Sequence, residues 1–180
     1  MALPIFETQL RRSAKTVLGD PRALPFLRDL LDIGIRFIRP GDLLCFSNDD
    51  VSFATGITDT LLRVEHAAWA SRHEFVRLPR LPTCLEILCA RKHCGADLFV
   101  FTPSWWKAHR SEFPDMLIGC EAWDLVLRKL MMACNGIELH AAIAHEVHEA
   151  TWQRRRADPS ALHNRTLAAQ WLGKRGLSWD

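Results

Sequence analysis

The sequence has no apolar stretch long enough to cross a membrane, since a spanning helix needs about 20 mostly apolar residues. Its N-terminal residues, MALPIFETQLRRSAK, also lack the apolar core of a secretory signal peptide. These absences exclude a membrane span and leave the cytoplasm as the expected compartment. The chain has 180 residues, of which 48% are hydrophobic and 24% charged, as in an ordinary globular domain.

The net charge is small, and no two cysteines have the spacing of a CxxC pair. The formal net charge is only +2, which gives no reason to expect a nucleic-acid partner. Six cysteines are present without a CxxC pair, so neither a zinc knuckle nor a disulfide framework is indicated, and most are expected to be small buried residues. Tyrosine is absent and tryptophan occurs seven times, which favours core packing over ligand stacking for Trp105, Trp106 and Trp123.

Helical and strand patterns alternate along the chain. Short apolar runs at 43–46, 96–101 and 116–119 are typical of buried strands. Helices are expected from Asp20-Pro21 to Pro40-Gly41, after Thr58, after a Thr83 and Glu86 capping box, after Thr102-Pro103, from 121 to 134, and from Asn164 to Gly173. This alternation predicts an α/β fold with a largely parallel sheet, formed by residues 1–180 as a single domain.

The segment AIAHEVHEATW, residues 142–152, contains two histidines, His145 and His148, each followed by a glutamate. The zinc-protease pattern HExxH needs histidines four residues apart, and here Glu149 stands where the second histidine should be. The segment therefore cannot form that site alone. Two interpretations stay open, namely one ligand of a metal site built elsewhere in the chain, or a polar surface. The apolar pattern of the segment is compatible with a helix and equally with a buried strand that ends at His145.

A second polar cluster, Asn48, Asp49 and Asp50, follows the apolar run 43–46. In open α/β sheets, ligands collect at the carboxyl ends of strands. Carboxylates at such a place suit a hard divalent cation that carries a diphosphate. A plain turn explains the same residues, because asparagine and aspartate are favoured there.

Several motifs together resemble the nucleotide-sugar transferases of the GT-A fold, and in particular bacterial glycosyltransferase-like proteins of that superfamily. The motifs, in chain order, are DLLCFSNDDV, GADLFVFTPSWW, FPDMLIGCEAWDLVLRKL and HEVHE. The resemblance covers roughly residues 16–172. It implies a Rossmann-like, largely parallel sheet with helices on both faces. Only about twenty residues precede the first expected helix, so we expect an N-terminally short domain that lacks the first strand of the fold.

The resemblance also implies roles for individual residues. Asn48, Asp49 and Asp50 fall on the Asp-x-Asp motif that binds the metal and the diphosphate, with Asp50 in its last acidic position. His145 or His148 falls on the late histidine that completes the metal site. Mn²⁺ or Mg²⁺ is the implied cofactor, and a nucleotide-sugar donor with an unidentified acceptor are the implied partners.

Glu121 falls on the acidic helix start that supplies the catalytic base, with Asp124 one turn further on. Acids are also favourable first-turn residues, so either carboxylate can equally be a helix start. Three classes of function remain open at this point. They are a metal-dependent glycosyltransferase, a metal-dependent hydrolase that uses the HEVHE segment, and a binding protein without catalysis.

Overall fold

In the computed structural model, the described part of the chain comprises residues 10–77, 80–147 and 157–179. These residues group into two compact units. The helical unit contains residues 10–39, 109–126 and 157–179, and the sheet unit contains residues 40–77, 80–108 and 127–147. Each unit is described by itself below.

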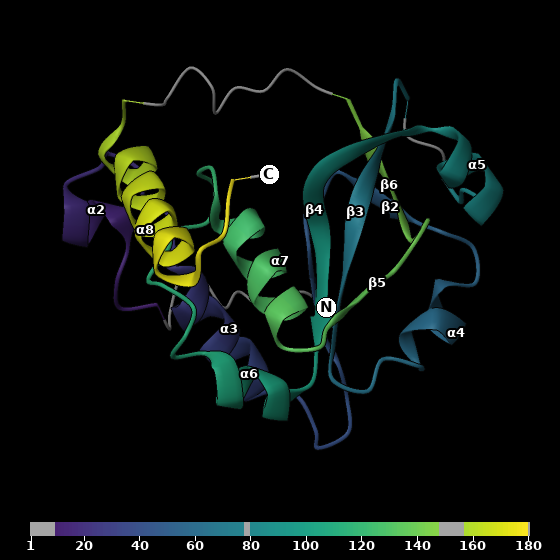
Figure 1. The fold of residues 1–180 in the computed structure, drawn as a ribbon, viewed down its shortest axis with the longest axis horizontal. Coiled ribbons are helices and arrows are strands. Elements are labelled where there is room, and N and C mark those ends of the chain that lie inside the picture. The colour runs from purple at the N-terminus through teal and green to yellow at the C-terminus, as the bar shows by residue number, and fades with distance from the viewer. Residues whose placement is uncertain (1–9, 78–79, 148–156, 180) are drawn as a thin grey trace. The chain divides into compact units, whose positions relative to one another are not determined.

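One mixed sheet dominates the sheet unit (Figure 1). Its strands are β1 (Leu44–Ser47), β2 (Val51–Phe53), β3 (Ala67–Phe75), β4 (Arg91–Phe101), β5 (Ile137–Glu138) and β6 (Ile143–Glu146). Along the sheet the order is β1-β4-β3-β6-β2, and β5 pairs with β3 as well. The helices that begin in this unit are α4 (Ile57–Leu61), α5 (Cys84–Cys89) and α6 (Pro103–His109).

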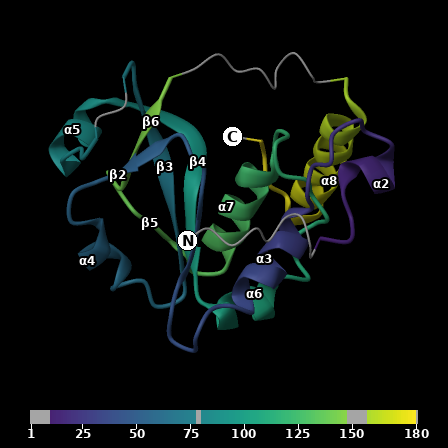
Figure 2. The ribbon, with the colours of Figure 1, turned by 180° about the vertical axis from the view of Figure 1, so that it is seen from behind.

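Strands β1 and β2 are consecutive in the chain, yet they occupy the two ends of the strand order. Only Asn48, Asp49 and Asp50 join them, and the chain from the end of β1 to the start of β2 can span at most about 14 Å. In a flat sheet, four strand spacings of about 4.8 Å would separate β1 from β2 by about 19 Å. The sheet must therefore curl until its two ends approach, and β4 is visibly bent in both views (Figures 1 and 2).

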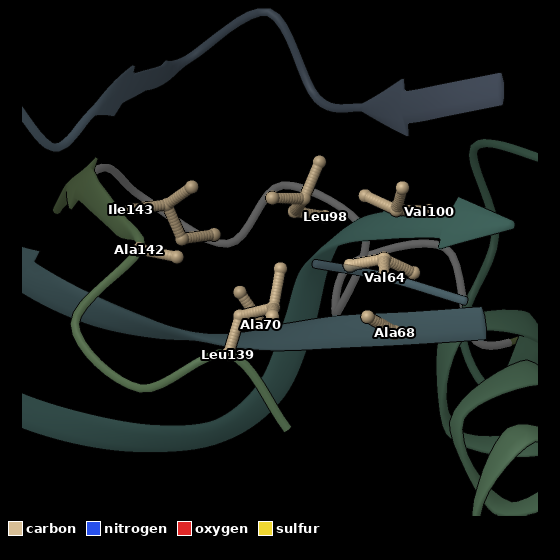
Figure 3. Close-up of a cluster of buried hydrophobic side chains, with 8 residues drawn as sticks. All are labelled: Val64, Ala68, Ala70, Leu98, Val100, Leu139, Ala142 and Ile143. Atoms are coloured by element: carbon tan, nitrogen blue, oxygen red, sulfur yellow. The ribbon is translucent and has the colours of Figure 1, made fainter. Parts of the chain in front are cut away.

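Buried apolar side chains from several strands meet on one face of this curled sheet, as Figure 3 shows. Neighbouring members of one strand are two residues apart, such as Leu98 and Val100 in β4, because alternate residues of a strand share a face. The members are Val64, Ala68, Ala70, Leu98, Val100, Leu139, Ala142 and Ile143. This cluster anchors the strands that carry the polar residues described below.

The prediction of a largely parallel, GT-A-like sheet is wrong. Among the strands that the structure describes, the pairs β1–β4, β3–β4 and β2–β6 are antiparallel, and only β3–β5 and β3–β6 are parallel. A helix can serve as a parallel crossover only if it covers much of a strand's length. With six residues, α5 extends about 9 Å along its axis, whereas the nine residues of β3 extend about 30 Å. The alternation of helix and strand signals therefore did not imply parallel strands.

Residues of the helical unit pack around Ala14, Phe26 and Leu117, which are all buried. Its helices are α2 (Ala14–Leu18), α3 (Leu27–Ile35) and α8 (Pro159–Arg175), and α7 (Trp123–Ala133) begins here and continues in the sheet unit. Inside this core, the side-chain amide of Asn164 donates to the carbonyl of Leu117 and accepts from its N–H, each at 2.8 Å. This side chain thus satisfies both backbone groups of Leu117.

Three expected elements in the helical unit are wrong or displaced. The helix expected from Asp20 begins only at Leu27, and Asp20 is instead a buried carboxylate. Residues 116–119 form no strand, because Leu117 makes only an isolated bridge to Phe26. The last helix begins at Pro159 after the N-cap Asp158, so Asn164 lies inside it and caps nothing.

Other predictions are confirmed. The Thr83 hydroxyl accepts from the N–H of Glu86, and the Glu86 carboxylate accepts from the N–H of Thr83, so the capping box is present. Strand β4 contains the run 96–101, and α7 lies within the expected helix 121–134. The expectation that most cysteines are buried is wrong, since Cys45, Cys84 and Cys89 are exposed.

Among the described helices, none is long and apolar enough to cross a membrane.

Candidate functional site

The connection between β1 and β2 carries the predicted Asp-x-Asp position, at the carboxyl end of β1 as expected. Asn48 is tied to Asp97 of β4 by two hydrogen bonds. Its backbone N–H donates to the carbonyl of Asp97 at 3.2 Å, and its Nδ2 donates to Oδ1 of Asp97 at 3.0 Å. Asn48 is therefore an anchor for a buried carboxylate, whereas the side chain of Asp49 is exposed.

His145 lies in β6, two residues after Ile143, so it continues the face that carries the apolar cluster. It is only 4% exposed. Its Nε2 is 3.3 Å from Oδ2 of Asp50 and 3.9 Å from Oδ2 of Asp97. The structure thus brings together Asp50 and His145, two of the residues that the sequence assigns to a metal site. His148 lies outside the described residues.

Sequence reasoning did not single out Asp97, although it is 4% exposed and faces the same imidazole. The pairing between β3 and β4 shifts at this point, because Ala70 pairs with Leu98 while Ser71 pairs with Ala96. Asp97 is the additional residue of a β-bulge, a distortion that turns a side chain away from strict alternation. The signal in the sequence was an aspartate inside the apolar run ADLFVF, since a buried carboxylate needs polar partners.

The distances between these side chains can be compared with those between the ligands of a divalent ion. Ligand atoms about 2.1 to 2.6 Å from one ion stand about 3.0 to 3.7 Å apart when they are adjacent in its coordination shell. The 3.3 Å between Asp50 and His145 falls in this range. Within the described part of the chain, the ligand atoms of Asp50, Asp97 and His145 do not all lie within 4.8 Å of one another. The pair Asp50 and His145 thus has the spacing of two adjacent ion ligands, which is also the spacing of a direct imidazole–carboxylate contact.

The strand conformation of residues 143–146 decides between the two local structures expected around His145, in favour of the strand. Residues 143–146 form β6, so the side chain of His145 is buried while that of Glu146 is exposed. On a strand, neighbouring side chains point to opposite faces, and the two cannot serve one ion together. Among the described residues of this segment, His145 is the one whose side chain faces Asp50.

The two candidate catalytic acids belong to the helical unit, and their position relative to Asp50 stays a prediction. Oε1 of Glu121 is 3.3 Å from Nη1 of Arg165, and the backbone carbonyl of Glu121 accepts from Nδ2 of Asn164 at 3.0 Å. Asp124 is half-buried. It lies in the first turn of α7, and Glu121 lies two residues before the helix.

The tryptophans considered as stacking platforms are core residues. Trp105 and Trp106 are 5% and 1% exposed, and both rings pack against Phe101 with centroids 5.6 Å away. Trp123 is also buried. Packing therefore accounts for these three side chains, and no sugar or base contact is assigned to them.

Comparison of the chain with protein-family models, curated proteins and solved structures found no match. Function is therefore argued from the site itself.

Proposed function

We propose that the chain is a metal-dependent transferase that moves a sugar from a nucleotide-sugar donor to an acceptor. The observation that carries this proposal is the 3.3 Å separation between Asp50 and His145, which joins the two motifs expected to share one ion. The proposal rests on this local pattern. It makes no use of the GT-A fold, because the largely parallel sheet of that fold is not found here.

Asp50 and His145 are the residues that would hold Mn²⁺ or Mg²⁺. When bound, such an ion neutralises the charge of a leaving diphosphate. Magnesium in particular needs few protein ligands, because it keeps several waters and takes substrate phosphates as further ligands. Asn48 fixes the carboxylate of Asp97, and Asp97 places a second negative charge 3.9 Å from the same imidazole nitrogen.

The proposal assigns removal of the acceptor proton to Glu121 or Asp124. Oε1 of Glu121 faces Arg165 at 3.3 Å, so the acceptor proton would go to Oε2. Substituting the true base by its amide is expected to lower turnover by about two to four orders of magnitude. Binding of the nucleotide sugar should stay nearly unchanged, because the base acts on the acceptor.

The test is a titration of Mn²⁺, followed by a panel of nucleotide sugars, monitored by calorimetry and thermal shift. Asp50→Asn and His145→Gln are expected to weaken Mn²⁺ binding by about tenfold or more, and to weaken binding of the nucleotide sugar together with it. Asp42→Asn and His140→Ala are matched controls, since both residues are exposed and lie in the same unit. Neither control should change the affinity for Mn²⁺.

A protonated His145 between two carboxylates would satisfy the same contacts without any ion. In that case His145→Gln changes only the free energy of unfolding, no Mn²⁺ binds, and the proposal is wrong. Release of free sugar from a donor in the absence of an acceptor would identify a hydrolase. Binding of a nucleotide sugar without turnover for any acceptor would identify a binding protein.

A further inference from the structure

Arg72 of β3 lies beside the candidate site and has no role in the proposed reaction so far. Its Nη1 is 3.6 Å from Oδ2 of Asp97, the same oxygen that lies 3.9 Å from Nε2 of His145. One carboxylate oxygen therefore stands between a guanidinium and the imidazole of the proposed ion ligand. Arg72 is 23% exposed at its side chain, so a ligand can reach it from solvent.

The backbone of β4 makes room for this guanidinium. Ser71 pairs with Ala96 and His73 pairs with Lys92, so residues 93–95 bulge opposite Arg72. Gly95 lies against the arginine, and a Cβ at this position would stand only 3.3 Å from both Cζ and Nε of Arg72. To admit it, the guanidinium, or the ring of His93, which is equally close, would have to shift by a few tenths of an ångström.

The guanidinium keeps unused capacity for hydrogen bonds. No acceptor for its Nε exists among the described residues, although this nitrogen is buried. Its Nη2 is 3.5 Å from Nε2 of His93, a long contact to a ring whose pKa is lowered by burial and by the charge of Arg72. Because an imidazole never carries a negative charge, His93 does not neutralise the arginine.

We propose that Arg72 binds a phosphate group of the ligand, beside the ion held by Asp50 and His145. A guanidinium presents planar donors that match two phosphate oxygens, and an arginine that is partly buried loses little hydration when it does so. This inference rests on the proposed function, since the phosphate belongs to the nucleotide diphosphate. The competing role is a purely structural one, in which Arg72 only balances the charge of Asp97.

The probe is inorganic pyrophosphate, titrated into the full-length protein with and without Mn²⁺. Arg72→Met is expected to raise the Kd for pyrophosphate by about tenfold or more. Arg72→Lys should raise it by less, because lysine keeps the positive charge but loses the two parallel donors of the guanidinium. Gly95→Ala should raise this Kd by less than Arg72→Met does, since it requires only a small shift of the guanidinium and leaves the group in place. Arg91→Met is the matched control, because this arginine lies on the neighbouring strand and is 84% exposed.

Binding of Mn²⁺ alone, followed by electron paramagnetic resonance, separates this inference from the proposed function. Unchanged pyrophosphate affinity in Arg72→Met and Gly95→Ala would overturn the phosphate role and leave the metal proposal intact. Pyrophosphate binding that depends on Arg72 without any Mn²⁺ binding would support the phosphate role and overturn the metal-dependent reaction. If Arg72→Met does not fold, Arg72→Lys decides, because a structural counter-charge survives in lysine while the bidentate contact does not.

Discussion

Replacing Asp20 by asparagine should destabilise the helical unit strongly, although the two side chains have nearly the same shape. The Asp20 carboxylate is 1% exposed and receives four hydrogen bonds. Three come from Arg22, through its backbone N–H, Nε and Nη2 at 2.8 to 2.9 Å, and the fourth comes from the Ser160 hydroxyl. An asparagine keeps only one acceptor oxygen and turns its amide nitrogen toward two of these donors, because each carboxylate oxygen receives two hydrogen bonds.

Removing one partner of a buried ion pair costs about 3 to 5 kcal/mol of unfolding free energy. The expected loss for Asp20→Asn lies at or below the low end, at about 2 to 3 kcal/mol, because Arg22 keeps its second partner Asp158 at 2.8 Å. With a urea dependence of about 2 kcal/mol per molar, the midpoint should fall by about 1 to 1.5 M. Tryptophan fluorescence, followed during a urea titration at pH 7, measures this midpoint. Asp158→Asn is the control, and its 37% exposed side chain predicts a loss below about 1 kcal/mol.

The effect of Asp20→Asn on the free energy of unfolding should also depend on pH. Hydrogen bonds from Arg22, followed by the Ser160 hydroxyl, hold the pKa of Asp20 far below its usual range despite burial, which acts in the opposite direction. The folded pKa is below the unfolded one, so the stabilisation is present above about pH 4 and is lost as the pH falls further. The difference between the wild type and Asp20→Asn should therefore shrink below pH 4. An equal difference at pH 7 and pH 3, or a difference under about 0.5 kcal/mol at pH 7, would refute the reasoning.

Two further substitutions test the helical unit by the same urea titration. Asn164→Ala should lower the free energy of unfolding by about 2 to 4 kcal/mol, because the buried N–H and carbonyl of Leu117 lose their partners. A loss below 1 kcal/mol would mean that water replaces the amide. Ala122→Gly should raise the free energy of unfolding by about 0.5 to 1 kcal/mol, because Ala122 has φ 77°, which glycine adopts without strain. Destabilisation by this change would show that the buried methyl group outweighs the strain.

Local signals in the sequence predicted local structure well. The capping box of Thr83 and Glu86 needs only residues three apart, and it is present. The buried run 96–101 needs only its own hydrophobicity, and it is a strand. The Asp20-Pro21 pair shows the limit of such signals. Aspartate before proline is a common helix start, but here the carboxylate is used by Arg22 and by Ser160, which is 140 residues further along the chain.

Strand direction could not be predicted in the same way. Whether β3 runs parallel or antiparallel to β4 depends on how residues 76–90 return to the sheet, and a helix signal in that segment does not reveal its length. The actual helix there has six residues, too few to act as a crossover along β3. Alternating helix and strand signals are therefore compatible with a mixed, curled sheet as well as with a parallel one.

The candidate site shows the same division between local and non-local information. Asp50 and His145 could be proposed as partners from two motifs, because the residue types and the resemblance pointed to one ion. Asp97 and Arg72 could not be added, since each reaches the site through a shift in the pairing of β3 with β4. A shift of this kind depends on two strands at once, so the aspartate inside ADLFVF indicated a buried carboxylate but not the direction of its side chain. The residues that sequence reasoning missed are those whose direction is set by the β-bulges, and a variant that restored regular pairing at residues 93–97 would be expected to turn Asp97 and Arg72 away from His145.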